Sequence, residues 1–299
     1  MIPSAVCVIA LLAGSACPPR KPPDAPGLVK PHQLPDAVTK LLAYANQRIA
    51  LGTANGFHYL YHADALVALS KARKRAPSDR QVLLLGSRVC RTLAERARGK
   101  GEQLKYADLG LVFTEAGRQH FGAEVAFHHL HAALLGLRVD AYHASAFSVV
   151  PKIKQACEQA ISIDRLHDHA GPLRVLGSLL ASIPESSPFN GDLERGIKLL
   201  TLAVKLAPSY PLNHYFLAEA LAKDEERDRA AKHYAQVICA STGPDYDAIL
   251  AHRYRALAKR GLRTLKRSDA TDCKGSPARR LEAPKTPRRT SVEPGGRTP

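Results

Sequence analysis

Four side chains that could ligate a metal lie close together in the middle of the chain: His120, Glu124, His128 and His131. Their spacings of four, four and three residues would place them on one face of a helix, and zinc is bound by imidazole and carboxylate groups. Gly122, however, interrupts the helix between the first two, and a zinc site needs three or four fixed ligands. We therefore expect no metal here and interpret these histidines as partly exposed side chains between helices.

A second polar cluster consists of His167, Asp168 and His169, just before a stretch that forms a helix. Aspartate accepts hydrogen bonds from nearby backbone amides, so we interpret Asp168 as a turn residue, with a polar rim as the alternative. The chain has no G-x-S-x-G nucleophile elbow, no phosphate-binding glycine loop and no H-E-x-x-H helix. These observations predict a non-catalytic protein that needs no cofactor.

The composition of the chain predicts that helices position these residues. The 299 residues are 45% hydrophobic and include no Trp, Ala and Leu dominate, and β-branched runs are short. This composition predicts an all-α fold with one extended core or two modest ones. The expected helices cover 37–51, 58–75, 80–98, 103–120, 123–139, 148–163, 171–183, a stretch after Asp192, 210–223, 225–240 and 246–266, with Asp36, Asp79 and Asp192 as N-caps and 99–101 as a turn.

One helix-hairpin pattern recurs along the chain. It consists of a small, a bulky and a small residue followed by proline, at the tetratricopeptide intervals of four, three and five. The members are Gly196, Leu200, Ala203 and Pro208; then Ala230, 34 residues after Gly196, with Leu217, Ala218, Tyr234 and Val237; and, upstream, Ala65, Leu69, Ala72 and Pro77. An insertion of seven residues, within 183–189, enlarges one turn. The repeat predicts tetratricopeptide-like stacked hairpins, an α-solenoid whose hollow surface binds rather than catalyses.

The repeat register also predicts a binding site. The second, fifth, ninth and twelfth positions of each first helix line the concave face of such a stack. They select Gln81, Leu84, Arg88, Arg91, Arg174, Ser178, Tyr215 and Glu219. Three arginines in one hollow favour an anionic or carboxylate ligand, because guanidinium offers paired donors. The alternative is that these arginines simply face water.

The N-terminal segment is typical of an exported lipoprotein. Residues 1–16 carry no charged side chain and contain a short apolar run at 6–13, which suits a signal peptide better than a spanning helix. Small residues precede Cys17, as in a bacterial lipobox, so Cys17 is the predicted lipidation site. The proline-rich segment 17–35 would tether the helical domain, 36–266, to a membrane. The alternative is an uncleaved or misassigned start.

Most of the net charge of +16 comes from the C-terminal end, since residues 253–299 hold 14 Lys or Arg and only 4 Asp or Glu. The tail 267–299 has almost no bulky apolar residue, so we expect it to be disordered. No aromatic side chain is interleaved with its charges, and we therefore expect no nucleic-acid partner. The six cysteines include no C-x-x-C pair; Cys90, Cys157 and Cys239 are expected to be buried thiols, and Cys273 to be exposed.

Several segments together resemble one known family. They are His-Asp-His-Ala-Gly-Pro-Leu-Arg-Val-Leu-Gly at 167–177, Asn-Gly-Asp-Leu-Glu-Arg-Gly at 190–196, Leu-Ala-Pro-Ser-Tyr at 206–210, and the Ala- and His-rich helix 126–136 that ends in glycine. The chain resembles the T component of bacterial TRAP transporters, the TatT family. The resemblance implies a periplasmic lipoprotein that works beside the solute-binding P component of an importer of organic acids or other small ligands. A general tetratricopeptide scaffold for protein assembly in the cell envelope is the alternative.

Overall fold

The computed structural model describes residues 28–54, 57–142, 146–243, 246 and 248–267. Within these ranges the regular structure is eleven α-helices and one short 3-10 helix, with no strand. The all-α prediction is therefore confirmed. The predicted signal peptide, Cys17, most of the tether, Cys273 and the tail from residue 268 lie outside the described residues.

The elements follow one another with short connections. In chain order they are η1 (Pro31–Gln33), α2 (Val38–Thr53), α3 (Tyr59–Arg75), α4 (Arg80–Glu95), α5 (Lys100–His120), α6 (Val125–Ala141), α7 (Ala146–Asp164), α8 (His167–Ser182), α9 (Leu193–Leu206), α10 (Pro211–Lys223), α11 (Arg227–Cys239) and α12 (Ala248–Thr264). None of these helices combines the length and the hydropathy that crossing a bilayer requires.

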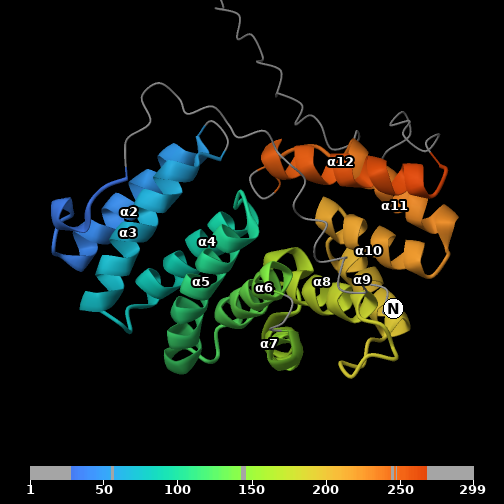
Figure 1. Cartoon of the computed structure of the whole chain (residues 1–299), viewed down its shortest axis with the longest axis horizontal. Coiled ribbons are helices and arrows are strands. Elements are labelled where there is room, and N and C mark those ends of the chain that lie inside the picture. The colour runs from blue at the N-terminus through green and yellow to red at the C-terminus, as the bar shows by residue number, and fades with distance from the viewer. Residues whose placement is uncertain (1–27, 55–56, 143–145, 244–245, 247, 268–299) are drawn as a thin grey trace, which may run out of the picture.

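Consecutive helices pair as hairpins, and the hairpins stack along an arc from α2 to α11 (Figure 1). Within the stack α4 packs on α6, α6 on α8, and α8 on α10, so these four helices form an inner layer. The helix α12 packs on α11 and also reaches α10. The predicted tetratricopeptide-like stack of hairpins is thus the observed architecture.

Two glycines allow α8 and α9 to cross closely. A Cβ atom on Gly177 of α8 would lie 2.8 Å from Leu200 and 3.0 Å from the carbonyl oxygen of Gly196, on α9. A Cβ on Gly196 would lie 2.8 Å from the Gly177 carbonyl oxygen in turn. A side chain at either position would therefore push the two helices apart, which explains why the repeat has its small residues here. The bulky and small positions of the pattern are likewise buried: Leu69, Leu200, Leu217, Tyr234, Ala65, Ala203 and Ala230.

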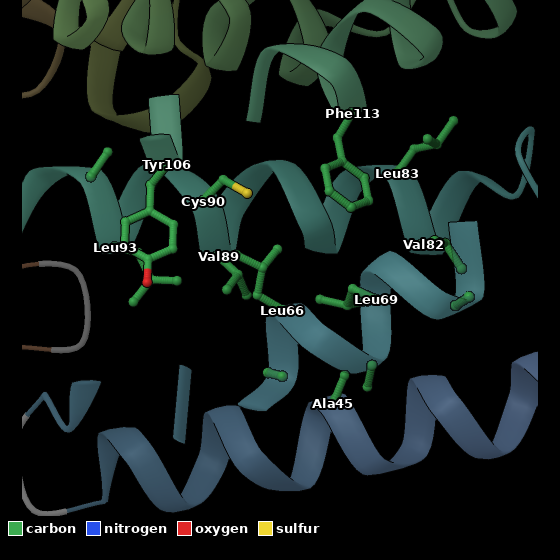
Figure 2. Close-up of a cluster of buried hydrophobic side chains, with 14 of the residues drawn as sticks. Ala45, Leu66, Leu69, Val82, Leu83, Val89, Cys90, Leu93, Tyr106 and Phe113 are labelled. Carbon is green, nitrogen blue, oxygen red and sulfur yellow. The ribbon is translucent and has the colours of Figure 1, made fainter. Parts of the chain in front are cut away.

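The N-terminal core lies between α2, α3, α4 and α5. Figure 2 shows Ala45 of α2, Leu69 of α3, Leu83 of α4 and Phe113 of α5 converging on it. A second large cluster joins α9, α10, α11 and α12, and a smaller one joins α6, α7 and α8. Packing is therefore continuous from hairpin to hairpin, as expected when each pair cannot bury its apolar face alone.

Two of the three predicted N-caps are confirmed. The carboxylates of Asp79 and Asp192 accept hydrogen bonds from the amides of Val82 and Arg195, at 2.9 and 2.8 Å. The prediction for Asp36 was wrong: Ala37 is the N-cap residue of α2, and Asp36 pairs instead with Lys71 and Arg75 of α3. Ion pairing across the hairpin thus replaces a local cap.

Two further local predictions need correction. Residues 99–101 do not form a separate turn, because α5 already begins at Lys100 with Gly99 as its N-cap. Cys90 and Cys157 are buried thiols as predicted, and burial raises the pKa of both. Cys239 is instead disulfide-bonded.

Candidate ligand cavity on the inner helices

A cavity of about 210 Å³ lies on the inner layer of the stack. Side chains from α4, α6, α8, α10 and α12 line it, so every hairpin from α4 onward contributes a wall. Five of the eight predicted site residues lie there: Arg91, Arg174, Ser178, Tyr215 and Glu219. These five residues come from α4, α8 and α10, and their binding role stays a prediction.

Asp168 connects three helices at one side of this cavity. The backbone of residues 168–170 is left-handed, with φ of 51, 56 and 61°, and turns the chain into the straight part of α8. From this turn the Asp168 carboxylate accepts hydrogen bonds from His129 Nε2 at 2.9 Å, Arg91 Nη1 at 3.4 Å and Arg174 Nη2 at 3.5 Å. The backbone of Asp168 forms a turn, as predicted. Its carboxylate, however, does not cap that turn but belongs to the polar rim of the cavity, which was the alternative interpretation.

Arg174 is fixed by several partners. Its side chain donates to Asn213 Oδ1 at 2.8 Å and to the carbonyl oxygen of His169 at 3.2 Å. The guanidinium also lies over the ring of Tyr210, 4.9 Å from the centroid, and that ring stacks on His169. With a relative exposure of only 7%, Arg174 is a preorganised wall of the cavity and not a solvated surface arginine.

The charges at this wall follow from burial and pairing. Burial lowers the pKa of His129 to about 4, although the neighbouring Asp168 carboxylate opposes that shift. Burial alone would raise the pKa of Asp168, but the hydrogen bond from His129 and the arginine charges hold it well below its usual range. Asp168 is thus ionised and His129 neutral. Because Nε2 of His129 donates to Asp168, Nδ1 carries the lone pair, and it is buried without a hydrogen-bond partner among the described residues.

The opposite wall comes from α10 and α12. The Glu219 carboxylate accepts a hydrogen bond from the Tyr234 hydroxyl, and burial raises the pKa of Glu219. Tyr254 of α12 packs edge-on against Tyr215 with 4.9 Å between the ring centroids. Arg253, also of α12, donates to the carbonyl oxygen of Glu95 at 2.9 Å and so connects the C-terminal helix to the end of α4.

Small residues of α6 form the base of the cavity between these walls. Ala132, Ala133 and Gly136 line it beside His129, one and two turns along the same helix face. The repeat register did not predict these three residues, because it covers only α4, α8 and α10. Their helical spacing within the segment 126–136 was the available signal.

Three predicted site residues lie elsewhere. Gln81 is exposed, and Leu84 packs against the N-terminal core. Arg88 lines a second hollow, of about 640 Å³, together with Ile49, Thr53, Phe57, His62, Leu85, Val89, Thr92, Arg96 and Gly243. The prediction that three arginines meet in one hollow is therefore corrected. Arg91 and Arg174 line the main cavity, whereas Arg88 lines the second hollow.

The histidine cluster does not converge on one point. His128 and His131 are buried, at 6% and 5% exposure, which corrects the expectation of partly exposed side chains. His128 donates to the carbonyl oxygen of Gly122, and His131 Nδ1 lies 2.9 Å from the Thr114 hydroxyl. Glu124 pairs with Arg80 at 2.6 Å. No group of three or more metal-ligating side chains occurs among the residues that the structure describes.

No family model matches the chain, and no curated protein matches it. Among solved structures it is similar to a chain titled "Functional Characterization of Pseudomonas Aeruginosa pilF". That similarity covers 78% of this chain and 88% of the other, with 15% sequence identity and a TM-score of 0.49. Because so distant a likeness carries no argument about function, the class of protein rests on this chain's own structure: a curved stack of helical hairpins with a cavity on its inner layer.

Proposed function

We propose that this protein is a non-catalytic binding protein of the bacterial cell envelope, which holds a small organic ligand in the cavity on its inner helices. The cavity itself carries the proposal, because it is large enough for a small molecule and side chains from several hairpins line it. The resemblance in the segments 126–136 and 167–210 supports a role like that of a TRAP transporter T component. The partner would then be the solute-binding P component of the importer.

The lining favours an amphipathic ligand of modest size. A cavity of about 150 Å³ already accommodates benzene, and this one measures about 210 Å³. Ala132, Ala133 and Gly136 offer apolar surface for a hydrocarbon part. At the polar side, the charged groups of Arg91, Asp168 and Arg174 line the cavity and offer hydrogen-bond donors and acceptors to a polar part of the ligand.

Gly136 offers a way to fill the cavity without disturbing the packed core. A Cβ atom on Gly136 meets no atom within 4 Å, so Gly136→Leu should place its side chain in the open space of the cavity. Native mass spectrometry of the purified full chain should show a co-purified small molecule, and this mass should disappear in Gly136→Leu. Gly101→Leu is the matched control, since Gly101 is also helical and also has open space around it, but lies away from the cavity.

Two results would count against ligand binding. One is a wild-type protein that carries no small molecule and captures none from an organic extract. The other is a molecule retained equally by Gly136→Leu and Gly101→Leu. Binding of purified P component without any small ligand would instead favour the general tetratricopeptide scaffold.

Location in the periplasm, through a lipid anchor at Cys17, belongs to the same proposal. The apolar run and the small residues before Cys17 support it. Cys17→Ser should abolish labelling by radioactive palmitate and release the protein from membranes. Unchanged labelling would exclude acylation at that cysteine.

A further inference from the structure

The exposed side of α12 carries a cluster of positive charges. Residues 248–267, which include the whole of α12, contain seven Lys or Arg and no Asp or Glu, so nothing within this segment balances them. Lys259 and Arg263 are four positions apart and lie on one face of the helix, with Arg260 beside them. All three side chains are exposed, and so is Lys266, just after the helix. These four residues are called the basic face below.

Basic side chains elsewhere on the surface are paired with carboxylates. On α9, Lys198 contacts Glu194 at 2.6 Å. At the end of α12 itself, Arg267 pairs with Asp228 of α11. The basic face, in contrast, forms no ion pair with any carboxylate of the residues that the structure describes. Its charges are therefore available to a partner.

The unpaired charges of the basic face are not explained by the stability of α12. Like charges four residues apart on a helix repel one another and so cost stability. The helix dipole favours Arg263, which lies in the last turn, but Lys259 and Arg260 lie before that turn. The charge of Arg260 acts on the Glu219 carboxylate, without an ion pair between them. A cluster that the fold does not need is a candidate for function.

The other side of α12 belongs to the fold. Ala258 and Leu262 are buried there, and Tyr254 lines the main cavity. Figure 1 shows α12 along the upper edge of the molecule, with α11 and α10, on which it packs, beneath it. No residue of the basic face lines the main cavity or the second hollow. The basic face is thus an outer surface, which suits an extended anionic partner better than a small anion.

We propose that the basic face of α12 docks on the surface of a bilayer that contains anionic phospholipids. Lipid phosphates form a broad array of negative charge, which complements a group of unpaired Lys and Arg side chains. A protein interface would need apolar or aromatic anchors beside the charges, whereas the exposed positions here are Ala256 and Thr264. The same positions indicate contact at the level of the headgroups, without insertion. This docking does not depend on a ligand in the main cavity.

The test measures how the full chain with Cys17→Ser binds to vesicles, so that no acyl chain at Cys17 contributes. One set of vesicles contains equal parts of phosphatidylcholine and phosphatidylglycerol, and the other contains phosphatidylcholine alone. Co-sedimentation should show binding to the first set only. This binding should weaken as salt is added, because salt screens the charges.

A pair of double variants locates the contact on α12. Lys259→Gln/Arg263→Gln should lower the partition coefficient at least about tenfold, because each basic side chain near an anionic surface contributes roughly fivefold. Lys40→Gln/Lys74→Gln is the matched control, since it removes two exposed charges from the first hairpin. It should bind within about twofold of the parent chain, because charges more than a Debye length from the lipid contribute little.

Circular dichroism of both double variants establishes that the helices remain. The proposal fails if the chain binds equally to vesicles without phosphatidylglycerol, or if the two double variants bind equally well, which would assign the contact to another basic segment. Absence of vesicle binding also overturns it. If the chain then binds polyglutamate, and Lys259→Gln/Arg263→Gln reduces that binding, the partner of the basic face is an acidic protein and not a bilayer.

Discussion

The two hollows beside α4 have arginines of the same helix in their linings, yet their electrostatics differ. In the main cavity Arg91 contacts Glu95 at 3.3 Å and Asp168 at 3.4 Å, and Arg174 also reaches Asp168. In the second hollow Arg88 is exposed, and Arg96 contacts Glu95 at 3.6 Å. The difference comes from Asp168. This residue lies 77 positions after Arg91 in the chain, and the packing of α8 places it beside Arg91. An arginine's helix face determines which hollow it lines, whereas distant segments determine whether its charge is already compensated.

The largest expected effect is at the carboxylate that distinguishes the two hollows. Asp168→Asn keeps the side-chain shape, and Asn tolerates the left-handed backbone at φ 51°. The substitution removes the charge that compensates Arg91 and Arg174, and because this network is only partly buried we expect a cost of about 2 kcal/mol, below that of a fully buried pair. Urea unfolding should therefore show a free energy of unfolding lower by about that amount.

Arg88→Gln is the control from the second hollow. Arg88 is exposed, so its replacement should change the free energy of unfolding by less than about 0.5 kcal/mol. Equal effects of Asp168→Asn and Arg88→Gln would show that the charges of the main cavity are not coupled as the geometry indicates.

A smaller effect is expected from pH. The pKa of His129 is lowered to about 4 in the folded chain, below its ordinary value of 6.5. Between these values the unfolded chain binds a proton that the folded chain does not, so stability is full above pH 6.5 and falls as the pH decreases toward 4. His131 and His233, also lowered to about 4 by burial, act in the same direction. Urea midpoints at several pH values should decrease over this window.

His129→Gln measures how much of this pH dependence belongs to the main cavity. At most about 3 kcal/mol of the loss is expected from one histidine, and the variant should have a correspondingly flatter profile. His120→Gln, on an exposed side chain, should reproduce the wild-type slope. A wild-type profile that stays flat between pH 6.5 and 4 would contradict a buried neutral His129.

Local and periodic features of the fold could be predicted from the sequence. The intervals from Gly196 to Pro208 predicted the α8–α9 hairpin, because close helix crossings demand glycine wherever they occur. The caps Asp79 and Asp192 were also predictable from the sequence, because an N-cap bonds to an amide only three residues further along the chain. The cap at Asp36 could not be excluded from the sequence, because its actual partners Lys71 and Arg75 lie 35 and 39 positions further along the chain.

For the candidate site, the sequence could predict some of the residues that line the cavity, but not the contacts that their side chains make. A single repeat register placed Arg91, Ser178 and Tyr215 in one cavity. It failed for Arg88, because neighbouring positions of α4 face different helices in a curved stack. The pairing of Asp168 with Arg91 and the approach of Arg253 to Glu95 are contacts over 77 and 158 positions, which no local pattern encodes.

The smallest expected effect tests whether both hollows are open space. A Cβ atom at Gly136 in the main cavity, or at Gly243 in the second hollow, meets no atom within 4 Å. Alanine at either position should thus be accommodated, and Gly136→Ala should raise the free energy of unfolding by about 0.5–1 kcal/mol, because alanine favours a helix interior. Gly243→Ala should give a smaller gain, because Gly243 lies outside the helices. Gly117→Ala provides the contrast, since its Cβ would lie 2.1 Å from Phe127, and it should destabilise the protein. If Gly136→Ala or Gly243→Ala destabilises the protein as Gly117→Ala does, the corresponding hollow is filled by packed side chains and cannot hold a ligand.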